Sequence, residues 1–592
     1  MHTTPSGLGS WKVRVFGEAF IEKGGICESL LMKHLIVVPA FLICILAYPQ
    51  DDKFLKIIQE ELNREVAEFA KTAQPPYFID YRVNDDETAT VSSSFGSLTQ
   101  SFGNHDRSFV VHVRVGDYLV DNTHPNEEGT DAGYGYFNET SLPIDDAEDA
   151  IRFKLWRATQ GQYKASLDQY NAVKNSMATK KEEKLPPDFS KEKVEQYYEA
   201  PGEKLAQIFN KEEWEARTRQ YSKLFLGDES ILSADVSMNV ACERRYYVSS
   251  EGASVVQNFT GAYIYVIASV RATDGEVVPL HRSYYAPTPA GLPADDVIET
   301  DIKTMIVTLQ KLKTAPLADP YTGPALLDGP VSGVFFHEIF GHRVEGHRLR
   351  SDMDGQTFKS KVNQKILPES MSVYCDPTVS QFGGRYLNGV YKYDDEGVKS
   401  KRVDVVEKGT LKNFLMSRSP MDNFMHSNGH GRATAGLSPV SRQSNLFVEA
   451  AKTKSSSELR EMLIKECKRQ KKEYGYFFKS VVGGFTTTDR YRPNAFNIFP
   501  TEVYRVYVDG RADELVRGVD LIGTPLAMFA EIAAVGNTHG VFTGFCGAES
   551  GYVPVSAISP SLFVRRIETQ KKPKSKIEET YLKAPLPSAR WR

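Results

Sequence analysis

The hydrophobic pattern of the N-terminal half alternates between helical and strand-like periods. Residues 52–72 place apolar side chains at three- and four-residue steps with charges between them, which predicts an amphipathic helix. Residues 145–179 and 293–314 also have helical patterns. Strand-like runs, rich in β-branched and aromatic residues, lie at 77–83, 88–96, 108–120, 244–252 and 258–272. We therefore expect a sheet across this half, with helices packed on it.

The apolar runs of the C-terminal half are shorter. Residues 324–342 predict a short strand followed by a helix. Residues 402–417 predict a hairpin that turns at 407–410, and residues 501–521 predict another. Residues 455–474 predict a helix capped at about Ser457.

These patterns predict an α+β protein of two domains divided by a proline-rich stretch near residue 316. The first, residues 52–316, is an N-terminal sheet with helices. The second, residues 317–569, is rich in antiparallel strands. The length of 592 residues agrees with this division, because single cores rarely grow past about 250–300 residues.

Composition is ordinary for a soluble globular protein, with 41% hydrophobic and 25% charged residues. The formal net charge of −4 lacks the basic bias that is typical of nucleic-acid-binding proteins. We therefore expect no nucleic-acid partner.

The first 47 residues have the layout of a prefix and a signal peptide. After Met32 come a lysine, an apolar run at 35–46 and then polar residues, and the run is too short for a membrane span. We expect translation to start at Met32 and the protein to be exported, periplasmic or secreted, with no stable membrane span after processing. If the run is instead a buried helix or strand, the protein is cytoplasmic. The charged residues 570–592 predict a flexible tail.

The cysteines do not form a disulfide framework, because six in so long a chain are too few and too widely spaced. Four remain after the predicted processing. If Cys546 binds a metal, we expect Cys242, Cys375 and Cys467 to be buried thiols, with one disulfide among them as the alternative.

The run FFHEIFGHRVEGH carries the candidate chemistry. His337 and His342 can hold Zn²⁺, and the carboxylate of Glu338 can take a proton from a water that the metal activates. The histidines are five residues apart, which places them roughly 140° apart on an ideal helix. Both can reach one metal only if the helix is distorted or ends between them. Gly341 best tolerates such a π-type bulge or loosened final turn.

A third ligand is needed, and two candidates are present. His347 lies five residues after His342, and Cys546 lies far downstream between Gly544 and Gly547, in a stretch expected to be rich in turns. Spacing alone leaves both open. Cys546 could also be a nucleophile paired with His539. Loss of activity after chelation would indicate a metal ligand, since a thiol nucleophile would survive removal of the metal.

Several motifs together resemble the TldD/PmbA family of metallopeptidases, over most of residues 52–569. The combination of HExxxH with a downstream Cys-Gly is specific, although either element alone is weak. The motifs are HEIFGHRVEG, Asp352-Met353-Asp354, Tyr393-Asp394-Asp395-Glu396-Gly397, SNGHGR at 427–432, VRGVDLIGTPL at 516–526 and CGAESG.

The resemblance implies a site and a fold. The ligands of zinc are then His337, His342 and Cys546, with Glu338 as catalytic base, and the zinc-site helix lies in the C-terminal domain of a two-domain TldD/PmbA-like fold. Because the chain retains all four residues, it resembles the catalytic TldD type. His347 departs from the family pattern and is an alternative or outer-sphere ligand.

The resemblance also implies partners and a substrate. We expect a zinc-dependent peptidase that hydrolyses extended or unfolded peptides, as a homodimer or as a heterodimer with a paralogue lacking the motif. Asn428, His430 and Arg432 form either a substrate contact or a structural loop.

Two alternatives stay open. A peptide-binding or partner-scaffolding protein with a structural metal is the competing function, and four protein ligands around the metal would favour it. The acidic residues 394–396 could bind a metal, but a solvated turn closed by Gly397 is the expectation.

Overall fold

The computed structural model describes residues 52–572 except 126–139, 180–185, 351–353 and 492–494. The predicted signal peptide and most of the predicted tail lie outside the described residues, so export and the flexible tail stay predictions. Among the described residues, none of the helices combines the length and apolar character needed to cross a membrane.

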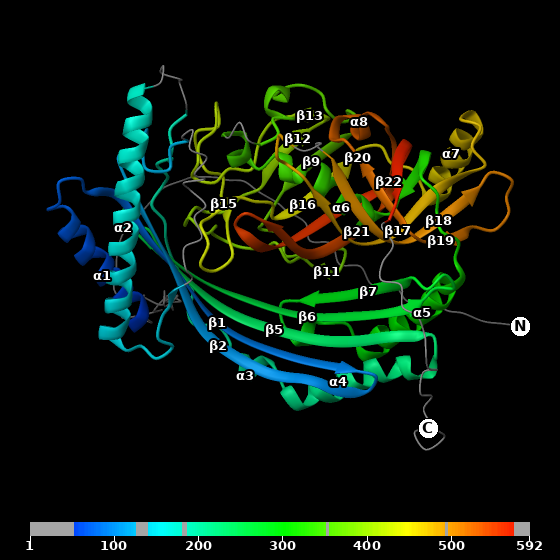
Figure 1. The fold of residues 1–592 in the computed structure, drawn as a ribbon, viewed down its shortest axis with the longest axis horizontal. Helices are drawn as coiled ribbons and strands as arrows, with labels where there is room; N and C mark the ends of the chain where they lie inside the picture. Colours follow the sequence, from blue (N-terminus) through cyan, green and yellow to red (C-terminus); the bar gives the residue numbers. More distant parts are fainter. Residues whose placement is uncertain (1–51, 126–139, 180–185, 351–353, 492–494, 573–592) are drawn as a thin grey trace, which may run out of the picture. The chain divides into compact units, whose positions relative to one another are not determined.

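The N-terminal half forms a seven-stranded sheet whose long strands are antiparallel, and one short strand, Gln196–Tyr198, joins it in parallel (Figure 1). Its strand order is β3-β2-β1-β5-β6-β4, with β7 also paired to β6. The strands are β1 (Pro76–Ser94), β2 (Ser97–Val115), β3 (Thr140–Ser141), β4 (Gln196–Tyr198), β5 (Ile231–Ser249), β6 (Ser254–Arg271) and β7 (Val277–Ala286).

Two strands predicted separately, 77–83 and 88–96, are one strand, β1. Polar residues interrupt the apolar pattern between them, but they still pair in the ladder. Asp85 forms an ion pair with Arg107 of β2 at 2.6 Å, so its charge is accommodated within the sheet.

Helices cover this sheet in two groups. Figure 1 shows α1 and α2 at one end of the long strands and α4 along their outer face. Asp52 caps α1 by accepting from the backbone N of Leu55 at 2.9 Å, and the predicted amphipathic face is buried. The helices are α1 (Lys53–Phe69), α2 (Glu148–Thr179), α3 (Leu205–Ile208), α4 (Lys211–Lys223) and α5 (Asp295–Thr314).

The C-terminal half forms an eleven-stranded mixed sheet in the order β13-β12-β9-β16-β22-β20-β18-β17-β8, with β19 paired to β18 and β21 paired to β22. Its pairings are antiparallel apart from β16–β22 and β17–β8. The strands are β8 (Tyr321–Leu327), β9 (Met371–Cys375), β12 (Val403–Glu407), β13 (Thr410–Leu411), β16 (Asn445–Ala450), β17 (Tyr474–Thr486), β18 (Phe496–Tyr507), β19 (Glu514–Val516), β20 (Val519–Gly523), β21 (Ile532–Ala548) and β22 (Gly551–Lys571).

Three helices accompany this sheet, namely α6 (Gly329–Ile339), α7 (Ser456–Arg469) and α8 (Pro525–Ala530). The cap of α7 is Ser455, two residues before the predicted position, because Glu458 must lie three residues after the cap to complete a capping box. The predicted hairpin turn at 407–410 is confirmed, with positive φ at Lys408 and Gly409. The α+β class is confirmed as well.

The acidic turn at 394–397 is buried, so the expectation of a solvated turn is wrong. Asp394 is 2% exposed and accepts from the backbone N of Glu396 and of Gly431. Asp395 forms an ion pair with Arg245 of β5. This arginine is supplied from 150 residues away, a contact that local sequence does not reveal.

Glu65 provides a stability prediction for the N-terminal half. Burial raises the pKa of Glu65 to about 7, although its hydrogen bond from Tyr81 Oη opposes this. A carboxyl whose folded pKa is raised contributes its full stability below its unfolded pKa, and loses it as the pH rises through the folded value. We expect Glu65→Gln to gain about 3 kcal/mol relative to wild type between pH 4.5 and 8. Urea unfolding at both pH values measures this, and an equal difference at both would contradict it.

Candidate functional site

The candidate site begins on α6, a buried helix in the C-terminal half. Asp328 caps it by accepting from the backbone N of Gly329 at 2.9 Å, and Pro330 is compatible with its first turn. Apolar side chains are buried all around the helix, which is typical of a central core helix. The motif therefore starts from a rigid support.

The helix ends between the two histidines. It stops at Ile339, Phe340 leaves the helical region with φ −125° and ψ −53°, and a short 3₁₀ turn follows over Gly341–Arg343. Of the two predicted distortions, the structure has the loosened end rather than a π-type bulge. As a result the rings of His337 and His342 lie 5.0 Å apart between centroids.

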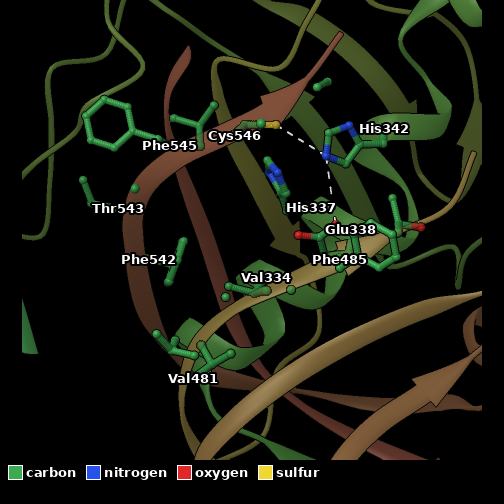
Figure 2. Close-up of a pocket in the computed structure, with 18 of the residues that line it drawn as sticks. Val334, His337, Glu338, His342, Val481, Phe485, Phe542, Thr543, Phe545 and Cys546 are labelled. Carbon is green, nitrogen blue, oxygen red and sulfur yellow. Dashed lines mark hydrogen bonds and ion pairs between the residues drawn. The ribbon is translucent and has the colours of Figure 1, made fainter. Parts of the chain in front are cut away.

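Cys546 completes the cluster from β21. Its Sγ lies 3.4 Å from His342 Nε2, and the potential ligand atoms of His337, His342 and Cys546 all lie within 4.8 Å of one another. Figure 2 shows the three side chains converging. Cys546 lies within a strand, opposite Val553 of β22, rather than in the expected turn.

Glu338 borders the same cluster. Its Oε2 lies 4.0 Å from His342 Nε2 (Figure 2). Gly484 of β17 passes directly over this side chain, since a Cβ there would come 2.5 Å from Glu338 Cγ. The carboxylate is thus held between α6 and β17.

The cluster opens into a cavity of about 610 Å³. Its walls come from α6, from β17 and β21 in the C-terminal sheet, and from β6 and β7 in the N-terminal sheet. Apolar side chains such as Val481, Phe542 and Phe545 line it beside the motif (Figure 2). Both halves of the chain therefore build the space in front of Glu338.

A buried network orients His342. Glu345 Oε2 lies 3.2 Å from His342 Nδ1 and accepts from Arg348 Nε at 2.9 Å. With Nδ1–H donated to Glu345, Nε2 presents its lone pair towards the cluster, which is the arrangement usual for metal-bound histidine. Arg442 connects this network to the cysteine by donating to the backbone carbonyl of Cys546.

His347 is not part of the three-residue cluster. Its Nε2 contacts Glu549 Oε1, and Arg348 Nη2 donates to the other carboxylate oxygen at 2.8 Å. Among the described residues, the cluster therefore has three protein ligands rather than four.

Asn428, His430 and Arg432 lie away from the cavity, in a buried loop. Asn428 bonds the backbone of Met416 and Phe414, and His430 is fully buried. Arg432 Nη1 donates to the carbonyls of Gln443 and Pro554. The geometry favours the structural alternative for this loop.

The cluster favours a thiolate. Burial opposes the charged form of Cys546, but His342, His337 and Arg442 outweigh it and hold the pKa of this thiol well below its usual range. Burial likewise opposes a charged His342, but Cys546 and Glu345 raise its pKa well above the usual value. Burial raises the pKa of Glu338, which His337 and His342 partly offset.

The donor set fits zinc. Two imidazole nitrogens and one thiolate are ligands that Zn²⁺ prefers, and in tetrahedral geometry its nitrogen and sulfur ligands lie roughly 3.5 Å apart. The Cys546 Sγ to His342 Nε2 distance of 3.4 Å matches this spacing. Three protein ligands also agree with a catalytic rather than a structural site.

The structure also tests two other predictions for the cysteines, a disulfide and a nucleophilic pair of Cys546 with His539. The described cysteines Cys242, Cys375, Cys467 and Cys546 are all free, so no disulfide joins them. His539 is seven residues before Cys546 on the same strand, about 23 Å along it. A nucleophile–base pair between these two is therefore not formed.

Gly341 is required for a steric reason that its sequence context does not show. A Cβ there would lie 1.8 Å from Gln443 Oε1, and Gln443 is fully buried. We expect Gly341→Ala to destabilise the protein by about 1–3 kcal/mol and to weaken metal binding, since it displaces the turn that carries His342. Urea unfolding and metal titration measure both effects. Gly161→Ala, where the added Cβ meets nothing within 4 Å, is the control; equal behaviour of the two variants would contradict the prediction.

Three residues that shape the site, Glu345, Arg442 and Gly484, were not predicted from the sequence. Glu345 offered a signal, because it lies three residues after His342 and so within reach of its ring. Arg442 and Gly484 offered none, since their contacts join segments about a hundred or more residues apart.

Comparisons with known proteins find metallopeptidase relatives. Residues 320–571 match the family model described as the PmbA/TldA metallopeptidase C-terminal domain. A metalloprotease of Archaeoglobus fulgidus is 28% identical over 271 residues, which cover 46% of this chain and 58% of the relative. A zinc metalloprotease TldD homolog of Saccharolobus solfataricus is 26% identical over 331 residues, which cover 54% of this chain and 68% of the relative.

A solved structure shares the fold. TldE from Thermococcus kodakarensis matches with a TM-score of 0.56 at 14% sequence identity, covering 87% of this chain and 100% of that chain. The fold is thus TldD-like on both sides of residue 316. Together with the family match over residues 320–571 and the metalloprotease relatives, this supports a protein of the TldD/PmbA family.

Proposed function

We propose that the chain is a zinc-dependent peptidase of the catalytic TldD type. The observation that carries the proposal is the convergence of His337, His342 and Cys546 beside the Glu338 carboxylate, at a cavity of about 610 Å³. The metalloprotease names of the relatives support the same class.

Each residue has a distinct task. His337, His342 and Cys546 hold the metal, with Glu345 orienting His342. Zinc, when bound, supplies a Lewis acid that polarises a carbonyl group and makes water more acidic. Glu338 takes the proton from the attacking water and gives it to the leaving amine.

The substrate is an extended or unfolded peptide. Strands of both sheets face the cavity, so an extended chain fits between them whereas a folded domain does not. The competing function, a peptide-binding or scaffolding protein with a structural metal, is disfavoured by the three-ligand cluster.

A second subunit is proposed to cover the cavity, either another copy of this chain or a paralogue without the motif. Two aromatic side chains that line the cavity are exposed, Phe485 at 56% and Phe545 at 45%, and Tyr552, which pairs with the lining residue Gly547, is 72% exposed. Exposed apolar patches of this kind mark protein interfaces. Light scattering of the chain purified alone gives its mass, and a monomer would point to the paralogue.

Metal analysis combined with a peptidase assay tests the function. We expect about one zinc per chain, hydrolysis of unfolded peptides, loss of hydrolysis after chelation and recovery with added zinc. Tightly bound zinc without any peptide hydrolysis, measured with the partner subunit present, would favour the scaffolding alternative.

A further inference from the structure

A small side cavity adjoins the catalytic cavity. It has a volume of about 160 Å³, and His281 and Val482 line both cavities. The side cavity lies where two hydrophobic cores meet. Val278 and Leu312 belong to the core of the seven-stranded sheet, whereas Val503 belongs to that of the eleven-stranded sheet.

Lys572 lines this side cavity, and the other charged side chains of its lining, Arg517 and Glu276, are engaged with each other. Arg517 forms ion pairs with Glu276 and, at 2.7 Å, with Asp274, and its Nε donates to the carbonyl of Ala315. Burial, helped by Lys572 and Arg282, lowers the pKa of His281, so its ring is neutral at pH 7. Most of the remaining lining is valine, leucine and proline, so the space suits an apolar group.

The size of the side cavity limits what it can take. An apolar cavity of about 150 Å³ accommodates a benzene molecule. A phenyl ring or a branched aliphatic side chain therefore fits, whereas a methyl group leaves most of the space unfilled. Pockets at the meeting of two structural layers are also the usual places for ligand recognition.

We propose that this side cavity is a specificity subsite, which receives a large apolar side chain of the peptide whose bond is cleaved beside Glu338. The inference rests on the proposed peptidase function and adds a substrate class to it. Filling the cavity removes apolar surface from water, which favours peptides with phenylalanine or leucine at one position over those with alanine by about 10- to 100-fold.

Val278 gives the sharpest test, because it lines the side cavity but not the cavity beside Glu338, and is partly buried. Peptides that differ only by phenylalanine or alanine at each position in turn are compared by kcat/KM. We expect Val278→Phe to fill the subsite and reduce the preference for phenylalanine to within about 3-fold. Val278→Ala enlarges the subsite and shifts the preference towards tryptophan.

Val307→Phe is the matched control, since it makes the same change at a position of α5 that is 49% exposed. It should leave the preference unchanged. The subsite is rejected if wild type shows no preference at any position, or if Val278→Phe keeps the full preference while its melting temperature and zinc content are normal.

A binding measurement separates this inference from the peptidase proposal. Fluorescein-labelled phenylalanine and alanine peptides are titrated onto zinc-loaded Glu338→Gln, with and without Val278→Phe. If wild type cleaves no peptide but the phenylalanine peptide binds at least 10-fold tighter and only when Val278 is present, the subsite stands and the peptidase proposal fails. Equal affinities for the two peptides would reject the subsite.

Discussion

Replacing Glu338 by glutamine is expected to reduce kcat for peptide hydrolysis by about 10²–10⁴-fold, because the amide cannot take the proton from the attacking water. The change is nearly isosteric, so the packing of Gly484 over this side chain is preserved. Zinc content should stay at about one per chain, since the three ligands are untouched. Steady-state kinetics with metal analysis on the same preparations measures both quantities.

Glu473→Gln is a suitable control, because this glutamate is an exposed side chain immediately before β17. It should keep the wild-type rate. A Glu338→Gln enzyme with an unchanged rate would remove Glu338 from the proposed mechanism, whereas a variant that also lost zinc would have disturbed the ligands themselves.

Replacing Cys546 by serine is expected to abolish stable zinc binding and hydrolysis together. A serine hydroxyl does not ionise near neutral pH, so the site loses the thiolate that completes the three-ligand set. The zinc content should fall from about one to below about 0.1 per chain after dialysis, with activity falling in proportion. Mass-spectrometric metal analysis and the peptide assay measure these.

Cys242→Ser is the control, because Cys242 lies on β5 outside the cluster and should retain both zinc and activity. This experiment also distinguishes Cys546 as a metal ligand from Cys546 as a nucleophile. A wild-type enzyme that kept its activity after complete chelation, while Cys546→Ser did not, would show that the sulfur acts as a nucleophile.

Local interactions explain what the sequence predicted well. The apolar period of helix α1 and the hairpin turn at 407–410 depend on residues only a few positions apart, so the sequence pattern alone locates them. The break between His337 and His342 follows from helix geometry in the same way. The cap of α7 was predicted two residues too late, because a neighbouring serine is an equally good N-cap residue.

Contacts between distant segments explain the failures. The sequence of the turn at 394–397 predicts a polar, solvated segment, yet the turn is buried and two arginines of the first sheet form ion pairs with Asp395. The sequence predicts two strands in place of β1, because charged residues at its centre interrupt the apolar pattern. The strand continues through them because β2 supplies a partner, Arg107, for the charge of Asp85.

The sequence by itself determined the candidate chemistry of this protein: two histidines at an unusual spacing, a glutamate between them and a set of motifs that resemble one family. Only the tertiary structure decided that Cys546 rather than His347 joins them, because β21 brings its sulfur to a histidine 204 residues away while Glu549 holds His347 aside. Such choices depend on how two sheets pack. No local pattern encodes the distance between side chains that meet only after folding.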